Sequence, residues 1–187
     1  MHAMVGHSRN RTPRHSRPVW STIDGAPPRQ HLLVAAAPFV QAAILLPGVM
    51  RVALIGSLTT DKPDPKDIDL LVTISDDTDV SELDRLARQL QGRVAATARG
   101  LYGADVFIND PAGRYLGRLC KHRECPSLRQ CAARHCGLRP HLKDDVDVIT
   151  LEQPLIAAPP VVLWPAVAAH VVVPSDVETI LLATLNS

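Results

Sequence analysis

This 187-residue sequence has few aromatic residues and almost no net charge. It has no cysteine outside one short stretch. Aromatic side chains make up 3% of the chain, which argues against binding nucleic acid by stacking on exposed bases. The formal net charge is +1, so no overall basic character attracts a polyanion. No apolar run typical of a secretory signal stands near the N-terminus, and prolines interrupt the apolar stretch after Leu151 too often for a membrane helix. We therefore expect a cytoplasmic protein without a membrane partner.

The segment from Arg51 to Ile74 carries the most informative pattern in the chain. An apolar run ends at Gly56, where glycine permits a sharp bend and a close approach to a ligand. After a polar loop, apolar residues recur at every second position from Asp67 onward, which predicts a β-strand. This period places Asp67 and Asp69 on one face, with roughly 6.5–7 Å between their Cα atoms. Two carboxylates so placed suit a hard cation such as Mg²⁺, which prefers oxygen ligands.

Gly56-Ser57, a spacer and then the Asp67-Ile-Asp69 strand resemble the motif of the DNA polymerase beta-like nucleotidyltransferase superfamily. The resemblance implies a small mixed β-sheet flanked by helices. It also implies that Gly56 and Ser57 hold the nucleotide phosphates and that Asp67 and Asp69 hold metal ions. In that superfamily a third carboxylate follows on a later strand. Asp105, in the strand-like run Gly-Ala-Asp-Val-Phe-Ile, is the suitable residue here.

By this resemblance, which covers residues 31–110, the chain is expected to be an enzyme. It would move a nucleoside monophosphate from a nucleoside triphosphate to an acceptor hydroxyl, with one or two Mg²⁺ ions as cofactor. The acceptor would be a protein, an RNA or a small molecule. The expected catalytic and metal-binding residues are Asp67, Asp69 and Asp105. Lys66, next to the expected phosphate site, would contact phosphate as a point charge.

A second reading of the same residues is a binding module. In this reading a nucleotidyltransferase fold with weak catalysis, stabilised by zinc, binds RNA or a protein. Leu58, Thr59 and Thr60 follow the Gly-Ser turn, where the superfamily often has small or basic residues. No helical substrate domain of the kind that such enzymes often carry is evident in the sequence. The three aspartates favour the enzyme over this alternative.

A competing carboxylate pair stands later in the chain. Asp145 and Asp147 lie two positions apart in a strand-like run. No Gly-Ser turn precedes them, so we interpret them as the polar face of a strand and rank them below Asp67 and Asp69.

All four cysteines stand in one short basic segment, with the spacing Cys-x4-Cys-x5-Cys-x4-Cys. Clustered thiols without a secretory signal favour a metal site over disulfides. Four thiolates complete a tetrahedral zinc site, and a nearby histidine can replace one of them. The predicted ligands are Cys120, Cys125, Cys131 and Cys136. An iron–sulfur cluster and thiols without metal stay open, but we favour structural zinc because so polar a segment has little apolar core.

The remaining patterns predict an α+β domain. The predicted elements are a helix over residues 31–46, a helix over Ser81–Gly92, and strands over residues 93–97 and 104–108. With the two strands of the Arg51–Ile74 segment, the order is α, β, β, α, β, β. That order suits a small mixed sheet with helices packed against it.

These observations divide the chain into four segments. Residues 1–30, with five arginines and several prolines, form a basic arm that we expect to lack regular structure. The composition of the arm also fits a nucleic-acid contact or an organelle transit peptide. Residues 31–113 form the nucleotidyltransferase core, residues 114–145 a Cys-rich basic insert, and residues 146–187 a C-terminal strand and helix that complete the domain.

Overall fold

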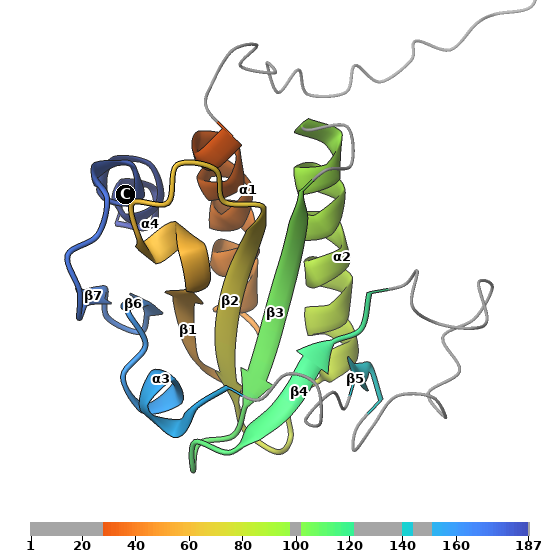
Figure 1. The fold of residues 1–187 in the computed structure, drawn as a ribbon. Helices are drawn as coiled ribbons and strands as arrows, with labels where there is room; N and C mark the ends of the chain where they lie inside the picture. The colour runs from red at the N-terminus through yellow and green to blue at the C-terminus, as the bar shows by residue number, and fades with distance from the viewer. Residues whose placement is uncertain (1–27, 98–101, 122–139, 144–150, 187) are drawn as a thin grey trace, which may run out of the picture.

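One mixed β-sheet organises the part of the chain that the computed structural model describes, namely residues 28–97, 102–121, 140–143 and 151–186 (Figure 1). Its seven strands lie in the order β5-β4-β3-β2-β1-β6-β7. Strands β2 and β3 are parallel, and the other neighbouring pairs are antiparallel. The strands are β1 (Val49–Ile55), β2 (Asp67–Ile74), β3 (Gly103–Asn109), β4 (Tyr115–Leu119), β5 (Leu142–Lys143), β6 (Val161–Trp164) and β7 (Ala168–Ala169).

Two long helices cover one face of the sheet (Figure 1). Helix α2 joins the parallel strands β2 and β3, because a parallel pair needs a crossover connection. Helix α1 lies beside α2 on the same face, and the C-terminal helical turns pack against α1. The helical elements are α1 (Pro28–Ala43), the 3-10 turn η1 (Gly56–Thr59), α2 (Val80–Thr97), α3 (Gln153–Ala157), the π-helical turn η4 (Val177–Leu182) and α4 (Ala183–Leu185).

The two-residue period of the strands separates two apolar clusters. Even-numbered residues of β2 and β3, such as Leu70 and Ile108, are buried under α1 and α2. On the opposite face Leu71 and Phe107 form a smaller cluster with Ile156 of α3. Because α3 is short, it covers only part of that second face, which leaves room there for polar side chains.

The predicted fold class, an α+β domain with a mixed sheet and helices, is confirmed. The strand predicted over residues 93–97 is wrong, because α2 continues through Gly92 to Thr97. Val94 is fully buried and extends the apolar stripe of Leu83 and Leu90 on the same helix. Packing of the Val94 side chain in the core therefore carries the helix past Gly92, the residue predicted to end it.

Two predicted boundaries are also wrong. Helix α1 begins at Pro28, so Arg29 belongs to the fold and not to the N-terminal arm. Strand β4 belongs to the sheet and all five of its residues are buried, so the segment that starts at residue 114 opens with core structure. The rest of the arm, residues 1–27, lies outside the described residues.

The Cys-rich segment is described only at its two ends. Cys120 directly follows β4, and its backbone N–H donates to the carbonyl of His141 over 2.9 Å. Three predicted zinc ligands, Cys125, Cys131 and Cys136, lie outside the described residues, as do Asp145 and Asp147.

The C-terminal part of the chain completes the sheet and the core. Strand β6 pairs with β1, which makes β1 an interior strand. Val177 and Leu181 of η4 are fully buried in the cluster under α1 and α2. Among the described residues, no helix combines the length and the apolar character that crossing a membrane requires.

Candidate active site

Three aspartates lie on the sheet face that α1 and α2 leave uncovered. Asp67 and Asp69 alternate along β2 with Ile68 and Leu70, whose side chains are buried on the helix side. Asp105 of β3 is the direct parallel neighbour of Asp69. Each of the three is only partly buried. We call Asp67, Asp69 and Asp105 the acidic face; they lie near the N-terminal ends of two adjacent strands. Asp67 and Asp69 share one face of β2, as the sequence predicted.

The Gly-Ser turn packs directly against this acidic face. Gly56 follows β1 and has a φ of +71°, a backbone conformation that residues with a Cβ atom rarely adopt. A Cβ atom at this position would stand 2.1 Å from Oδ2 of Asp69. Only glycine therefore lets the turn come so close to the carboxylate.

Hydroxyl groups of two threonines close the same turn. Thr59 Oγ1 donates to the carbonyl of Gly56 over 2.8 Å, and Thr60 Oγ1 donates to the carbonyl of Ser57 over 2.9 Å. In the sequence these threonines favoured the binding module, because the superfamily often has small or basic residues after the Gly-Ser turn. In the structure they hold the backbone of the turn in shape.

Gly103 gives Asp67 the same kind of room. Gly103 is the parallel neighbour of Asp67, and a Cβ atom there would stand 2.2 Å from Asp67 Oδ1. Two of the three aspartates are thus packed against glycine backbone.

The carboxylates of the acidic face repel one another. The pKa of Asp69 is raised from 3.8 to about 6, first because the carboxyl is desolvated by burial and then because of the charges of Asp105 and Asp67. The positive charges of Lys121 and Lys62 act against this rise. A further cation beside Asp69 would relieve the same repulsion.

Two basic side chains already contact Asp105. Lys121 Nζ lies 2.8 Å and Arg118 Nη1 lies 3.3 Å from Asp105 Oδ1. That oxygen is buried and accepts no hydrogen bond of good geometry from the described residues, so the two contacts are ionic. The sequence missed both bases at this site, because it assigned them to the insert.

Lys66, which was predicted to contact phosphate, contacts other residues of the protein in the structure. Its ammonium pairs with Asp64 and lies over the ring of Tyr102, 5.5 Å from the ring centre. Its carbonyl accepts a hydrogen bond from the N–H of Gly103 over 3.0 Å. Lys66 therefore ties the loop before β2 to the start of β3, while its side chain stays more than half exposed.

Arg29 holds the Gly-Ser turn from behind, which the sequence did not predict. Its guanidinium donates to the carbonyls of Leu58 over 2.7 Å and Thr60 over 2.8 Å, and it forms a two-point ion pair with Asp176. The hydrogen bonds join α1 to η1, and the ion pair joins α1 to the start of the C-terminal turn. Pro28, which favours the first turn of a helix, was the local signal that Arg29 is helical.

The donor set of the acidic face suits Mg²⁺, because three carboxylates supply oxygen ligands only and their repulsion is relieved by a divalent ion. Among the described residues, however, no three His, Cys, Asp or Glu side chains stand ready to hold a metal ion. One oxygen of Asp105, Oδ1, lies instead within ion-pair distance of Lys121 and Arg118.

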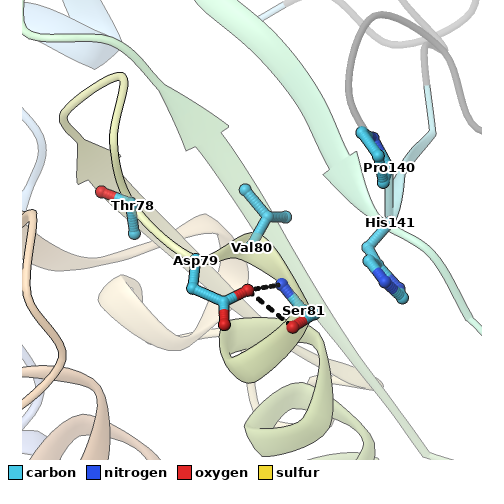
Figure 2. Close-up of a pocket in the computed structure, with 6 residues that line it drawn as sticks. All are labelled: Thr78, Asp79, Val80, Ser81, Pro140 and His141. Carbon is cyan, nitrogen blue, oxygen red and sulfur yellow. Dashed lines mark hydrogen bonds between the residues drawn. The ribbon is translucent and has the colours of Figure 1, made fainter.

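A shallow depression elsewhere on the surface lies between the start of α2 and the segment before β5 (Figure 2). Asp79 precedes α2, and its carboxylate caps the helix by accepting hydrogen bonds from the backbone N–H and the hydroxyl of Ser81. His141 Nδ1 lies 3.2 Å from the buried carboxylate of Asp84. The depression follows the C-terminal end of β2, whereas the acidic face lies at its N-terminal end, so the two are separate.

The span of residues 15–125 matches a protein-family model and is more than half of the chain. The chain belongs to the DUF6932 family. DUF6932 is a family of unknown function, so membership assigns no activity. The DUF6932 span contains the whole acidic face, the Gly-Ser turn and both bases at Asp105, whereas Asp176 lies beyond it. Comparison with curated proteins and with solved structures gave no match.

Proposed function

We propose that this DUF6932 protein is a Mg²⁺-dependent nucleotidyltransferase, which moves a nucleoside monophosphate from a nucleoside triphosphate to an acceptor hydroxyl. One observation carries the proposal. Three aspartates share one face of two adjacent strands, and one of them, Asp69, stands directly against the Gly56 backbone of a Gly-Ser turn. The arrangement supports an enzyme of the nucleotidyltransferase superfamily that the sequence motif resembles.

In this proposal Asp67, Asp69 and Asp105 hold the divalent ion, which when bound neutralises charge on the attacking and leaving oxygens. Backbone N–H groups of the turn at Gly56 and Ser57 orient the triphosphate. The acceptor oxygen bonds to the α-phosphorus as the bond from that phosphorus to the β-phosphate oxygen breaks and pyrophosphate leaves. The carboxylate of Asp105 takes up the proton of the acceptor hydroxyl, or fixes that hydroxyl in line. Lys66 reaches a phosphate only after leaving Asp64, which its exposure permits.

The test is a labelling experiment with the full chain. The protein is incubated with each labelled nucleoside triphosphate, Mg²⁺ and a cell extract, and the labelled acceptor is isolated. Asp69→Asn should abolish transfer, because it removes one carboxylate while keeping its shape. Asp77→Asn is the matched control, since Asp77 is exposed beyond the other end of β2 and should transfer normally. Transfer by Asp69→Asn at the wild-type rate would contradict the proposal.

A second candidate is the zinc-stabilised binding module with weak or lost catalysis. The contacts of Asp105 with Arg118 and Lys121 favour it, because they already offset the charge that a metal ion would offset. Calorimetry distinguishes the two functions. An enzyme should bind Mg²⁺ more tightly when a nucleoside triphosphate is present, whereas the binding module should show no such coupling.

A further inference from the structure

The two bases at Asp105 differ in how firmly they are held. Arg118 lies inside β4, and its side chain is 6% exposed. Lys121 lies two residues beyond β4, and its side chain is 33% exposed. A lysine ammonium on a flexible four-carbon stem can move into water at low cost, whereas a buried guanidinium cannot. Lys121 is therefore the contact of Asp105 that can be exchanged.

Strand pairing brings Lys121 to the acidic face. Arg118 pairs with Phe107 of antiparallel β3, so the chain beyond β4 runs toward the beginning of β3, where Asp105 lies. The missing side chain of Gly103 leaves room in the same place. A Cβ atom there would lie 2.2 Å from Asp67 Oδ1 and 4.0 Å from Lys121 Nζ. The ammonium of Lys121 therefore lies near Asp67 of β2 as well as Asp105 of β3.

We propose that Lys121 is a built-in counter-cation of the acidic face, which occupies Asp105 in the cation-free protein and is displaced when a divalent cation binds there. The inference rests on the proposed function and adds its regulation: Lys121 sets the cation affinity. It keeps the buried oxygen of Asp105 neutralised between reaction cycles. Once displaced, its charge lies beside the site, where it is available to an anionic ligand.

The experiment measures Mn²⁺ binding to the full chain without nucleotide, by the loss of the free-ion electron paramagnetic resonance signal. Lys121→Gln should bind Mn²⁺ about tenfold more tightly than wild type, because the ion no longer competes with an internal charge. Lys121→Arg, which keeps the charge, should bind like wild type. Arg114→Gln is the control at the opposite end of β4, where an exposed Arg114 pairs with Asp110, and should also bind like wild type.

Thermal unfolding provides a second measurement that does not depend on activity. In chelator Lys121→Gln should melt below wild type, because Asp105 keeps a buried oxygen and loses its nearest cation. Saturating Mn²⁺ should abolish that difference. A gap that persists in Mn²⁺ would mean that Lys121 is a structural pair only and would overturn the inference.

The outcomes separate the inference from the function on which it rests. Equal or weaker Mn²⁺ binding by Lys121→Gln, with clear binding by wild type, overturns the role of Lys121 and leaves the nucleotidyltransferase proposal standing. Absence of Mn²⁺ binding in wild type and in Lys121→Gln, with and without a nucleoside triphosphate, overturns both.

Discussion

Gly56 and Asp69 approach each other so closely that a Cβ atom on Gly56 would stand 2.1 Å from Oδ2 of Asp69 and 2.8 Å from its Cγ. The two residues come from different elements, since Gly56 is the first residue of η1, directly after β1, and Asp69 lies in β2. Ile55, just before the glycine, is the antiparallel neighbour of Asp69. The turn and the carboxylate are thus fixed relative to each other by the strand register.

Replacement of Gly56 by alanine should disturb both the turn and the acidic face. The positive φ alone costs a residue with a Cβ ~1–2 kcal/mol, and the clash with Asp69 adds to it. We expect Gly56→Ala to lose at least ~2 kcal/mol of unfolding free energy in urea and to lose Mn²⁺ binding.

Gly92→Ala is the matched control for this substitution. Gly92 lies in α2, and a Cβ atom there would meet nothing within 4 Å. Alanine should stabilise that helix by about 0.5–1 kcal/mol, since glycine is the poorer helix former. If Gly56→Ala unfolds at the same urea concentration as wild type, the close packing of the turn against Asp69 is wrong.

Arg29 should contribute more to stability than any of the exposed arginines of α2. It is 8% exposed and binds two backbone carbonyls of the turn and Asp176. Arg29→Met keeps the apolar stem but leaves those carbonyls and the Asp176 carboxylate without their donor. The expected loss is about 3 kcal/mol of unfolding free energy, measured by urea denaturation.

Arg85→Met gives the comparison for Arg29. Arg85 forms an exposed pair with Glu82 on the surface of α2, and such pairs contribute well under ~1 kcal/mol. Equal stability of Arg29→Met and Arg85→Met would show that the contacts of Arg29 do not support the turn.

The sequence predicted strand β2 and the shared face of Asp67 and Asp69 correctly. The alternation that starts at Asp67 depends only on which face of one strand is buried, and the structure has β2 begin at that residue. Contacts between strands were beyond reach of the pattern. The pair of Lys121 with Asp105 depends on the register of β3 with β4, and no local signal gives that register.

The errors along the chain share this cause. A glycine often ends a helix by adopting a positive φ, and Gly92 was predicted to do so. Burial of Val94 instead keeps α2 helical through Gly92. Arg29 looked like part of a basic arm because its partner, Asp176, is 147 residues away in the chain. Local composition cannot report a contact at that separation.

The cysteine cluster gives a prediction that depends on the sequence alone. Reduced, tag-free protein should contain one zinc per chain by elemental analysis, and Cys125→Ser should lose it. The sheet should stay largely folded in that variant, because its core lies under α1 and α2. Ser127→Ala, in the same segment, should keep the zinc. Protein with neither zinc nor iron in stoichiometric amount would exclude this metal site.

Asp69 gives a prediction in which pH determines the sign. Its pKa is about 6 in the folded protein, above the ordinary value of 3.8, so the folded state binds the proton more tightly than the unfolded state. Stability from this group is therefore full at low pH, falls as pH rises between those two values, and stays low above them. The loss at high pH is on the order of 2–3 kcal/mol, the free-energy equivalent of a shift of about two pH units.

Asp69→Asn resembles the protonated carboxyl at every pH, and we therefore expect its stability relative to wild type to depend on pH. In chelator at pH 8 the variant should melt above wild type, because wild type holds an ionised carboxylate beside Asp105 and Asp67. At pH 4 the two proteins should melt within a degree or two of each other, since wild-type Asp69 is then protonated as well.

Asp77→Asn, in which the replaced carboxyl is exposed and has a lowered pKa, should not melt above wild type at pH 8. An Asp69→Asn variant that melts well below wild type at pH 8 in chelator would identify Asp69 as a structural carboxylate that the fold needs in its charged form, and the acidic face could then not be a cation site built on mutual repulsion.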